Sequence, residues 1–385
     1  MIEHEDDILN DDSSQNIINS TRVGITHGDV NGIGYEVIIK TLADIRVMDF
    51  FTPVVYGSSK VASYHRKTLS ASDFTFNIIK SADQAKDNKP NLVNVYHQEI
   101  KIDLGESTEI AGQVAYMALE SAIEDLKKGH LEALVTAPIN KQNIQSADFK
   151  FPGHTEYLAK KFGVNEPLML MVSNNVRIGV ITGHVALKDV PNIITEELIL
   201  RKIRVLNQSL KQDFGIQRPK IAVLGLNPHA GDKGILGMEE INIITPAINK
   251  AFDEGILAFG PYPADGFFGS STFKEFEGIL AMYHDQGLIP FKTLAFKSGV
   301  NFTAGLPVVR TSPAHGTAYE IAGKNMASPD AFRESVYLAL DIVKNRKIYE
   351  EINSNPLKAS SKFDGDDDSD KLDLNLLSEA DDSKL

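Results

Sequence analysis

The chain has 385 residues, of which 42% are hydrophobic and 24% are charged. This length and composition predict a soluble globular protein of two domains. The formal net charge is −13, so the basic footprint of a nucleic-acid-binding protein is absent. No apolar run is long enough to span a membrane. With no Cys, disulfides, thiolate catalysis and Cys-bound metals are excluded, and with no secretion-signal pattern a cytoplasmic location is predicted.

The negative charge is concentrated at the two ends of the chain. Residues 1–20 carry six acidic residues and no Lys or Arg, and residues 359–385 carry nine acidic residues and three Lys. Removing −6 and −6 from −13 leaves about −1 for the body of the chain. We therefore expect an acidic disordered extension at 1–20 and an acidic disordered tail at 359–385.

Between these ends, short apolar runs alternate with amphipathic stretches, a pattern that predicts an α/β fold with a largely parallel sheet. The predicted strands are 22–26, 54–56, 133–136, 177–182, 220–226 and 278–282. The predicted helices are 34–42, 113–128, 196–214, 239–252 and 331–344.

Clusters of polar and small residues follow most of these predicted strands. In open α/β sheets the binding site lies beyond the carboxyl ends of the strands, so this pattern predicts an enzyme cleft. The clusters are His27-Gly28-Asp29, 137–141, Gly183-His184, Asn227-Pro228-His229 and 283–286.

Three of the ten His residues stand out because each follows a predicted strand. They are His184, His229 and His284. Three neutral imidazoles suit a catalytic divalent metal with open positions for substrate, although their spacing matches no short ligand motif. General acid or base catalysis by one of them is the alternative.

A second set of residues is suited to binding an anionic substrate. His154 and Thr155 precede or open a predicted helix, whose free N–H groups attract phosphate or carboxylate. Lys292, Asn301 and Arg310 add donors in the C-terminal part of the chain. The guanidinium of Arg310 suits bidentate anion binding, with a structural ion pair as the alternative. Together these residues favour a small phosphorylated substrate.

The glycine-rich sequence GDVNGIG at residues 28–34 follows a predicted strand and opens a predicted helix. It does not match the G-x-G-x-x-G fingerprint of an ordinary dinucleotide-binding fold. The segment is therefore either a tight turn or a ligand-binding loop.

Taken together, the motifs resemble the 4-hydroxythreonine-4-phosphate dehydrogenase family of pyridoxal 5′-phosphate biosynthesis. The resemblance covers about residues 21–345 and keeps the motifs in order. They lie at 26–36, 135–141, 153–156, 225–231, 263–265, 281–287 and 299–318.

The resemblance implies a two-domain fold like that of isocitrate and isopropylmalate dehydrogenases, with an interdomain cleft. It places the first domain at 21–148 plus about 288–358, and the second, with the metal site and dimer contacts, at about 149–287. It implies a homodimer with a shared active site, in which His284 acts across the interface.

The implied reaction is the NAD-dependent oxidation and decarboxylation of 4-phosphohydroxy-L-threonine to 3-amino-2-oxopropyl phosphate. NAD is favoured over NADP, and no residues are assigned to its binding. One divalent metal, which is zinc, cobalt, manganese or magnesium, binds His184, His229 and His284. The substrate ligands are His154, Thr155, Lys292, Asn301 and Arg310. Asp265 and Lys292 are the candidates for the proton acceptor.

Two other functions are compatible with the same residues. The first is the same oxidation of a four-carbon sugar-acid phosphate, threonate or erythronate 4-phosphate. The second is a metal-dependent phosphate-ester hydrolase, in which the three His would activate water. NAD binding distinguishes the hydrolase from both dehydrogenases.

Overall fold

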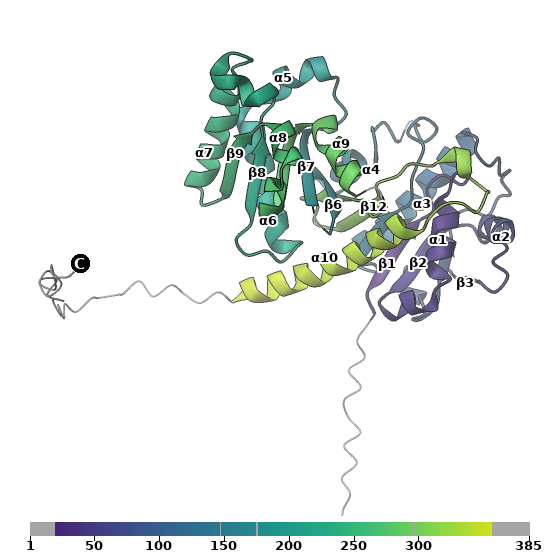
Figure 1. Ribbon diagram of the computed structural model, residues 1–385. Coiled ribbons are helices and arrows are strands. Elements are labelled where there is room, and N and C mark those ends of the chain that lie inside the picture. The colour runs from purple at the N-terminus through teal and green to yellow at the C-terminus, as the bar shows by residue number, and fades with distance from the viewer. Residues whose placement is uncertain (1–19, 147, 175, 296, 356–385) are drawn as a thin grey trace, which may run out of the picture.

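The computed structural model describes residues 20–146, 148–174, 176–295 and 297–355. In this part of the chain the strands form one sheet, in the order β3-β4-β2-β1-β5-β12-β11-β6-β7-β10-β8-β9 (Figure 1). The strands are β1 (Arg22–Thr26), β2 (Thr52–Gly57), β3 (Asn77–Ile79), β4 (Asn91–Asn94), β5 (Ala133–Thr136), β6 (Leu168–Ser173), β7 (Val176–Thr182), β8 (Lys220–Leu224), β9 (Leu257–Tyr262), β10 (Gly278–Tyr283), β11 (Val300–Ala304) and β12 (Val309–Pro313).

Helices alternate with these strands along the chain, which confirms the predicted α/β class. The α-helices are α1 (Gly34–Leu42), α2 (Ser59–Thr68), α3 (Glu109–Lys127), α4 (His154–Lys161), α5 (Val190–Ile193), α6 (Glu196–Gln212), α7 (Thr245–Asp253), α8 (Ala264–Gly269), α9 (His284–Leu294) and α10 (Asp330–Ser354). The shorter helical turns are η1 (Ile45–Asp49), η2 (Ala82–Gln84), η3 (Leu187–Asp189), η4 (Pro228–Gly234), η5 (Glu240–Ile244), η6 (Thr272–Glu275) and η7 (Tyr319–Ile321).

The sheet has two parallel halves that run in opposite directions. Eight of its strand pairings are parallel. The three antiparallel pairings are consecutive and join β12 to β11, β11 to β6 and β6 to β7. Because three reversals change the direction once overall, β7, β10, β8 and β9 run opposite to β1, β2, β5 and β12. The largely parallel sheet was predicted, but its central reversal was not.

The predicted strands all occur, and their bounds shift by no more than two residues. The strand predicted at 220–226 ends at Leu224, for example, and the strand predicted at 54–56 extends to 52–57. Strands β6, β9, β11 and β12, together with the short β3 and β4, were not predicted. Three of the missed strands, β6, β11 and β12, form the antiparallel centre of the sheet.

The predicted helices also occur, with changes at their ends that local chemistry explains. Helix α3 begins at Glu109 rather than 113 because the side chain of Thr108 caps it by accepting a hydrogen bond from the Ala111 N–H. The helix predicted at 239–252 is divided into the π-turn η5 and α7. Pro246 follows this division, and its missing N–H interrupts the regular hydrogen-bond ladder.

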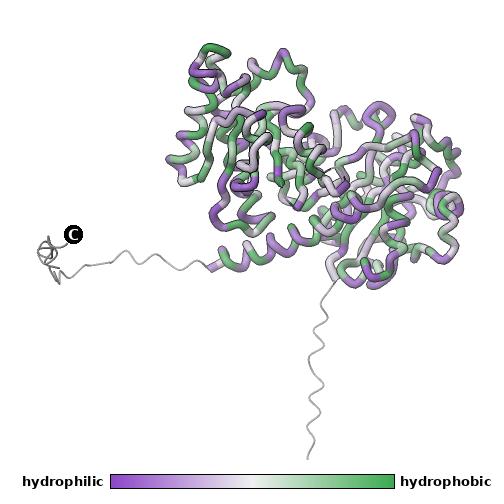
Figure 2. Tube along the Cα trace, viewed as in Figure 1, coloured by the Kyte–Doolittle hydropathy of each residue, from purple (hydrophilic) through white to green (hydrophobic). Residues whose placement is uncertain are grey.

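The long helix α10 extends along both halves of the sheet. It contacts β5, β11 and β12 as well as α1 and α6, and Figure 1 shows it running from one half toward the other. Figure 2 shows hydrophobic and hydrophilic stretches alternating along it. Its buried side chains include Phe332, Val336, Ala339 and Val343, which recur at the three- to four-residue spacing of one helix face.

The two-domain division at 21–148 plus 288–358 and at 149–287 stays a prediction, because one sheet runs through both ranges. The predicted acidic segments 1–20 and 359–385 lie outside the described residues, apart from Ser20. Among the helices that the structure describes, none has both the length and the apolar character needed to cross a bilayer.

Candidate active site

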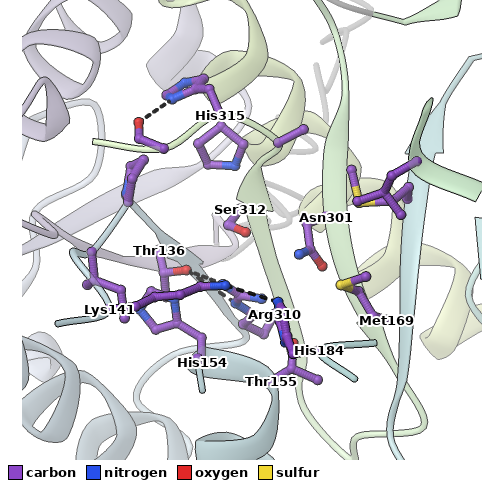
Figure 3. Close-up of a pocket in the computed structure, with 18 of the residues that line it drawn as sticks. Thr136, Lys141, His154, Thr155, Met169, His184, Asn301, Arg310, Ser312 and His315 are labelled. Carbon is purple, nitrogen blue, oxygen red and sulfur yellow. Dashed lines mark hydrogen bonds between the residues drawn. The ribbon is translucent and has the colours of Figure 1, made fainter. Parts of the chain in front are cut away.

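A polar cavity of about 270 Å³ lies against one face of the central strands. Its floor comes from side chains at alternate positions, which point to the same side of a sheet. Asn301 pairs with Ser312 on β12 and with Met171 on β6, so these three side chains share a face. Met169 and Arg310 lie two positions along their strands and belong to the same face (Figure 3).

Three segments form the walls of this polar cavity. One is the loop after β5, which contributes Lys141, and another is the first turn of α4, which contributes His154 and Thr155. The third is α9, whose residues at positions 284, 288 and 292 are spaced by four and therefore share one helix face. This spacing aims His284 and Lys292 into the same cavity.

Arg310 is a buried cation held by hydroxyl groups. Its side chain is 2% exposed, and burial lowers its pKa to about 9. Its Nη2 and Nε donate to Thr136 Oγ1 over 2.7 and 3.2 Å (Figure 3). Its Nη1 donates to Thr303 Oγ1 over 3.3 Å. Of the ion pairs in the described residues none involves Arg310, which rejects the structural ion pair as its role.

Several other polar atoms in the cavity are buried without a partner. They include Nε2 of His154, Oδ1 of Asn301 and Nε2 of His315. Burial, together with the charges of Arg310 and Lys141, holds the pKa of His154 well below its ordinary value, so this ring is neutral. Unpaired buried polar atoms are costly in a folded protein, so their gathering in one cavity indicates a binding site for a polar ligand.

His184 and His284 meet at one side of the cavity. Their ring centroids are 5.9 Å apart, and Nδ1 of His284 lies 2.7 Å from Oδ1 of Asp285. Nε2 of His184 lies 3.0 Å from Nζ of Lys141, and its Nδ1 lies 3.8 Å from Oε1 of Glu156. For His284, the carboxylate beside Nδ1 leaves Nε2 available to a metal ion, an arrangement common at metal sites. For His184, Nε2 is in contact with Lys141, so this lysine would have to move before the ring could bind a metal.

His229, the third predicted metal ligand, lies outside this cavity. It is exposed on the turn η4, where residues 229–233 all have positive φ. Such a run is rare for residues with side chains, and it is held by Glu240, which accepts hydrogen bonds from the N–H groups of Leu226 and Asn227. No three His, Asp or Glu side chains come close enough to hold a metal within the described residues.

Asp265, a predicted proton acceptor, also lies outside the polar cavity of its own chain. It is exposed in the first turn of α8. Helix α8 contacts η4, so Asp265 and His229 are on neighbouring elements. The two predicted residues that the cavity lacks are therefore on two exposed elements that contact each other.

One expectation about the geometry is corrected by the structure. The site does not lie at one common edge of the sheet. The strands that lead to His184 and His284 run opposite to β5, so the carboxyl ends of the two halves face opposite edges, and the site lies on the face between them. His284 shares a cavity with His184 of its own chain, and its expected action across an interface stays a prediction.

Sequence reasoning missed several residues that shape the cavity. Thr136, Thr303 and Glu156 hold or neighbour the functional side chains, and Lys141 contacts His184. The alternation of Asn301 and Thr303 could have placed both on one strand face, if β11 had been predicted.

A second and mainly apolar cavity of about 450 Å³ adjoins the polar one. The two cavities share Lys292, Ala314 and His315. The apolar side chains that line it include Ile33, Phe291, Ala295, Ala318 and Ile321. A flat organic ring bound there would lie beside a polar ligand in the first cavity.

Comparison with known proteins identifies relatives over most of the chain. Residues 49–339 match the family described as pyridoxal phosphate biosynthetic protein PdxA. A Bacteroides thetaiotaomicron protein named 4-hydroxythreonine-4-phosphate dehydrogenase is 51% identical over 94% of this chain and 99% of its own length. An Oceanobacillus iheyensis protein provisionally named D-threonate 4-phosphate dehydrogenase is 36% identical over 83% of this chain and 97% of its own length. A Klebsiella pneumoniae crystal structure of 4-hydroxythreonine-4-phosphate dehydrogenase superposes with a TM-score of 0.71 at 34% identity, over 84% and 98%.

Proposed function

Because this chain belongs to the family of the pyridoxal phosphate biosynthetic protein PdxA, we propose that it oxidises and decarboxylates 4-phosphohydroxy-L-threonine with NAD. The product is 3-amino-2-oxopropyl phosphate. The observation that carries this proposal is the buried guanidinium of Arg310, which has only hydroxyl acceptors in the structure. Glu156 attracts this charge through space but forms no ion pair with it. A buried charge without a directly bonded counter-ion is costly, so the site calls for an anionic substrate.

The charges around the polar cavity support a doubly anionic substrate. Lys141, Lys292 and Arg310 line it, whereas Glu156 is the one acidic side chain among its described lining residues. The substrate's phosphate and carboxylate suit these cations and the N–H groups at the start of α4. Asn301 and His154 supply further polar contacts that fix the orientation of the carbon chain.

The apolar cavity is suited to the nicotinamide ring of NAD. Hydride transfer requires the ring to lie against the reacting carbon, and the shared residues Lys292, Ala314 and His315 put the two cavities side by side. The apolar lining around Ile33 and Phe291 excludes water from a ring bound there. We therefore assign the cofactor to this second cavity.

Two of the three predicted metal ligands fit a metal site in one chain. His184 and His284 adjoin, and Asp285 supports His284. A divalent ion, zinc, cobalt, manganese or magnesium, would be held by these two and by His229 of a second copy. When bound, it would act as a Lewis acid that lowers the pKa of the substrate hydroxyl.

The surface around His229 supports a homodimer with a shared site. Ile235 and Leu236, 78% and 45% exposed, lie just beyond η4, and Met238 and Ile241 continue the patch. Such an exposed apolar patch is typical of a protein interface. A second copy docked here would bring His229 and Asp265 to the cavity together, because they lie on contacting elements.

The chain's own residues then position the substrate and move its proton. Hydride leaves C3 of the substrate for nicotinamide while the C3 hydroxyl gives its proton to Asp265 of a second copy, or to Lys292 if its amine is uncharged at that step. The resulting ketone lies β to the carboxylate, whose C–C electron pair enters the carbonyl as CO2 departs. The enolate that remains takes back one proton on the carbon that carried the carboxylate. Arg310 and the start of α4 hold the anionic groups through both steps. With no Cys in the chain, a reducing cytoplasm suits the reaction.

The Oceanobacillus relative supports threonate 4-phosphate as a second candidate substrate. The test is to follow NADH absorbance with NAD and either 4-phosphohydroxy-L-threonine or threonate 4-phosphate, with and without a chelator. NADH formation with the amino substrate alone, lost on chelation, is the expected result. NADH formation with threonate 4-phosphate alone would show that this compound is the substrate. Release of inorganic phosphate without NADH would show that the protein is a hydrolase and not a dehydrogenase.

A further inference from the structure

The glycine-rich turn at residues 28–34 lies behind both cavities. Its backbone is bonded to the loops that wall them, because Asp29 N–H donates to the Pro138 carbonyl over 2.9 Å and Ile33 N–H donates to the Thr317 carbonyl over 3.1 Å. Gly32 is required by this close approach, since a Cβ there would lie 2.8 Å from the Thr317 oxygen. Only Ile33 of this turn lines either cavity, so a supporting role suits the turn better than ligand contact.

At the centre of the turn, the carboxylate of Asp29 joins three distant parts of the chain. It is 1% exposed and accepts hydrogen bonds from the Asn31 N–H, Asn143 Nδ2 and the Tyr319 hydroxyl over 2.8, 2.7 and 2.7 Å. All three partners are donors from neutral groups. A buried carboxylate with three such bonds fixes the geometry of its neighbours strongly, because any lost bond leaves a buried charge unsatisfied.

Neither side-chain donor lines a cavity itself, but each lies close in sequence to residues that line a different one. Asn143 follows the loop from Thr136 to Lys141 that lines the polar cavity. Tyr319 begins η7, between Ala318 and Ile321, which line the apolar cavity. Ala318 has a φ of 45°, a left-handed conformation that is unfavourable for alanine and needs its neighbours to hold it.

We propose that Asp29 is a positioning residue that fixes the wall of the nicotinamide cavity through Tyr319 and the wall of the substrate cavity through Asn143. This inference rests on the proposed function, because it takes the apolar cavity as the nicotinamide site. Asp29 touches neither substrate nor cofactor. It acts by keeping Ala318 and Ile321 where the ring of the cofactor needs them.

The test replaces Tyr319 with Phe, which removes the hydroxyl donor and keeps the ring. NADH fluorescence, titrated without substrate, measures cofactor binding in a chain that contains no Trp. We expect the Kd for NADH and the KM for NAD to rise about 3- to 10-fold, with kcat changed less than about twofold. Asp29→Asn should raise the Kd for NADH and the KM for NAD by a similar factor. In the double variant these constants should be little higher than in either single variant.

Tyr56→Phe is the matched control. It removes a tyrosine hydroxyl that donates to Asp125 over the same 2.7 Å, at a position that lines neither cavity. It should lower Tm as Tyr319→Phe does but leave NADH binding unchanged. The positioning role is wrong if Tyr319→Phe and Tyr56→Phe bind NADH equally well. It is also wrong if the effects of Asp29→Asn and Tyr319→Phe on the Kd for NADH are fully additive in the double variant. If the wild-type chain fails to bind NADH at all, the proposed function fails, and this inference fails with it.

Discussion

Acidification should destabilise this protein through a buried stack of aromatic and imidazole rings. His27 and His65 pack on the two sides of Tyr35, with ring centroids 5.1 and 4.9 Å from it. Tyr96 packs edge-on against His27. Burial lowers the pKa of both histidines to about 4, against hydrogen bonds to the carbonyls of Gly28 and Val30 that raise it. Both rings are therefore neutral in the folded protein.

The sign and size of the effect follow from these pKa values. Above pH 6.5 both states of each histidine are neutral, so neither contributes to the pH dependence. As the pH falls below 6.5, the unfolded chain binds protons before the folded chain does, and stability decreases until the folded pKa is passed. A lowering of about 2.5 pKa units at 1.36 kcal/mol per unit gives about 3 kcal/mol for each histidine. For a marginally stable protein this loss is large.

Urea unfolding at pH 7 and pH 4.5 measures the predicted loss. His27→Phe keeps a ring in the stack but has no proton to bind, so its loss of stability between the two pH values should be smaller than that of the wild type by about 2–3 kcal/mol. His97→Phe, at an exposed position, is the control. An equal pH dependence in His27→Phe and wild type would refute the reasoning, whatever the stability of the variant at pH 7.

Two further predictions address the active site. Arg310→Met should raise the KM for the phosphorylated substrate about 100-fold, because the anion loses its guanidinium partner. The Tm should be unchanged or higher, because the variant removes a buried unpaired charge. A change in KM under about threefold, measured by NADH formation, would contradict anion binding by Arg310. Inactive His184→Ala and His229→Ala chains, mixed and allowed to exchange, should recover about a quarter of wild-type activity, because half of the dimers are mixed and each has one intact site. His184→Ala chains mixed with His284→Ala chains should recover no activity. Activity in that mixture would show that His284 acts in the site of the partner chain.

The sequence was sufficient to predict the outer parallel strands, because buried runs such as residues 133–136 and 278–282 are continuously apolar. It was insufficient for β11 and β12, where Asn301, Arg310 and Ser312 interrupt the apolar pattern to serve the cavity. Functional polar residues on a strand remove the signal by which the strand is recognised. The reversal of the sheet was missed because β6, β11 and β12 carry it, although the polar interruption applies only to β11 and β12, since β6 is largely apolar.

The candidate site was predicted in part. Seven of the nine predicted residues line the polar cavity, which are His154, Thr155, His184, His284, Lys292, Asn301 and Arg310. His229 and Asp265 do not line it, and under the proposed homodimer a second copy would supply them. The roles of Thr136 and Thr303 depend on contacts between residues far apart in the sequence, which no local pattern encodes.

The placement of β12 and α10 determines when the protein can fold during its synthesis. Strand β12 pairs with β5 at Val309 and Ala133, and α10 then packs across β5, β11 and β12. The half of the sheet that leaves the ribosome first therefore has an unpaired strand edge and an uncovered apolar face until the last described residues are translated. An edge of this kind invites pairing with other nascent chains. We therefore expect an interrupted synthesis that ends before β12 to leave a more aggregation-prone fragment than it would in a protein with sequential domains.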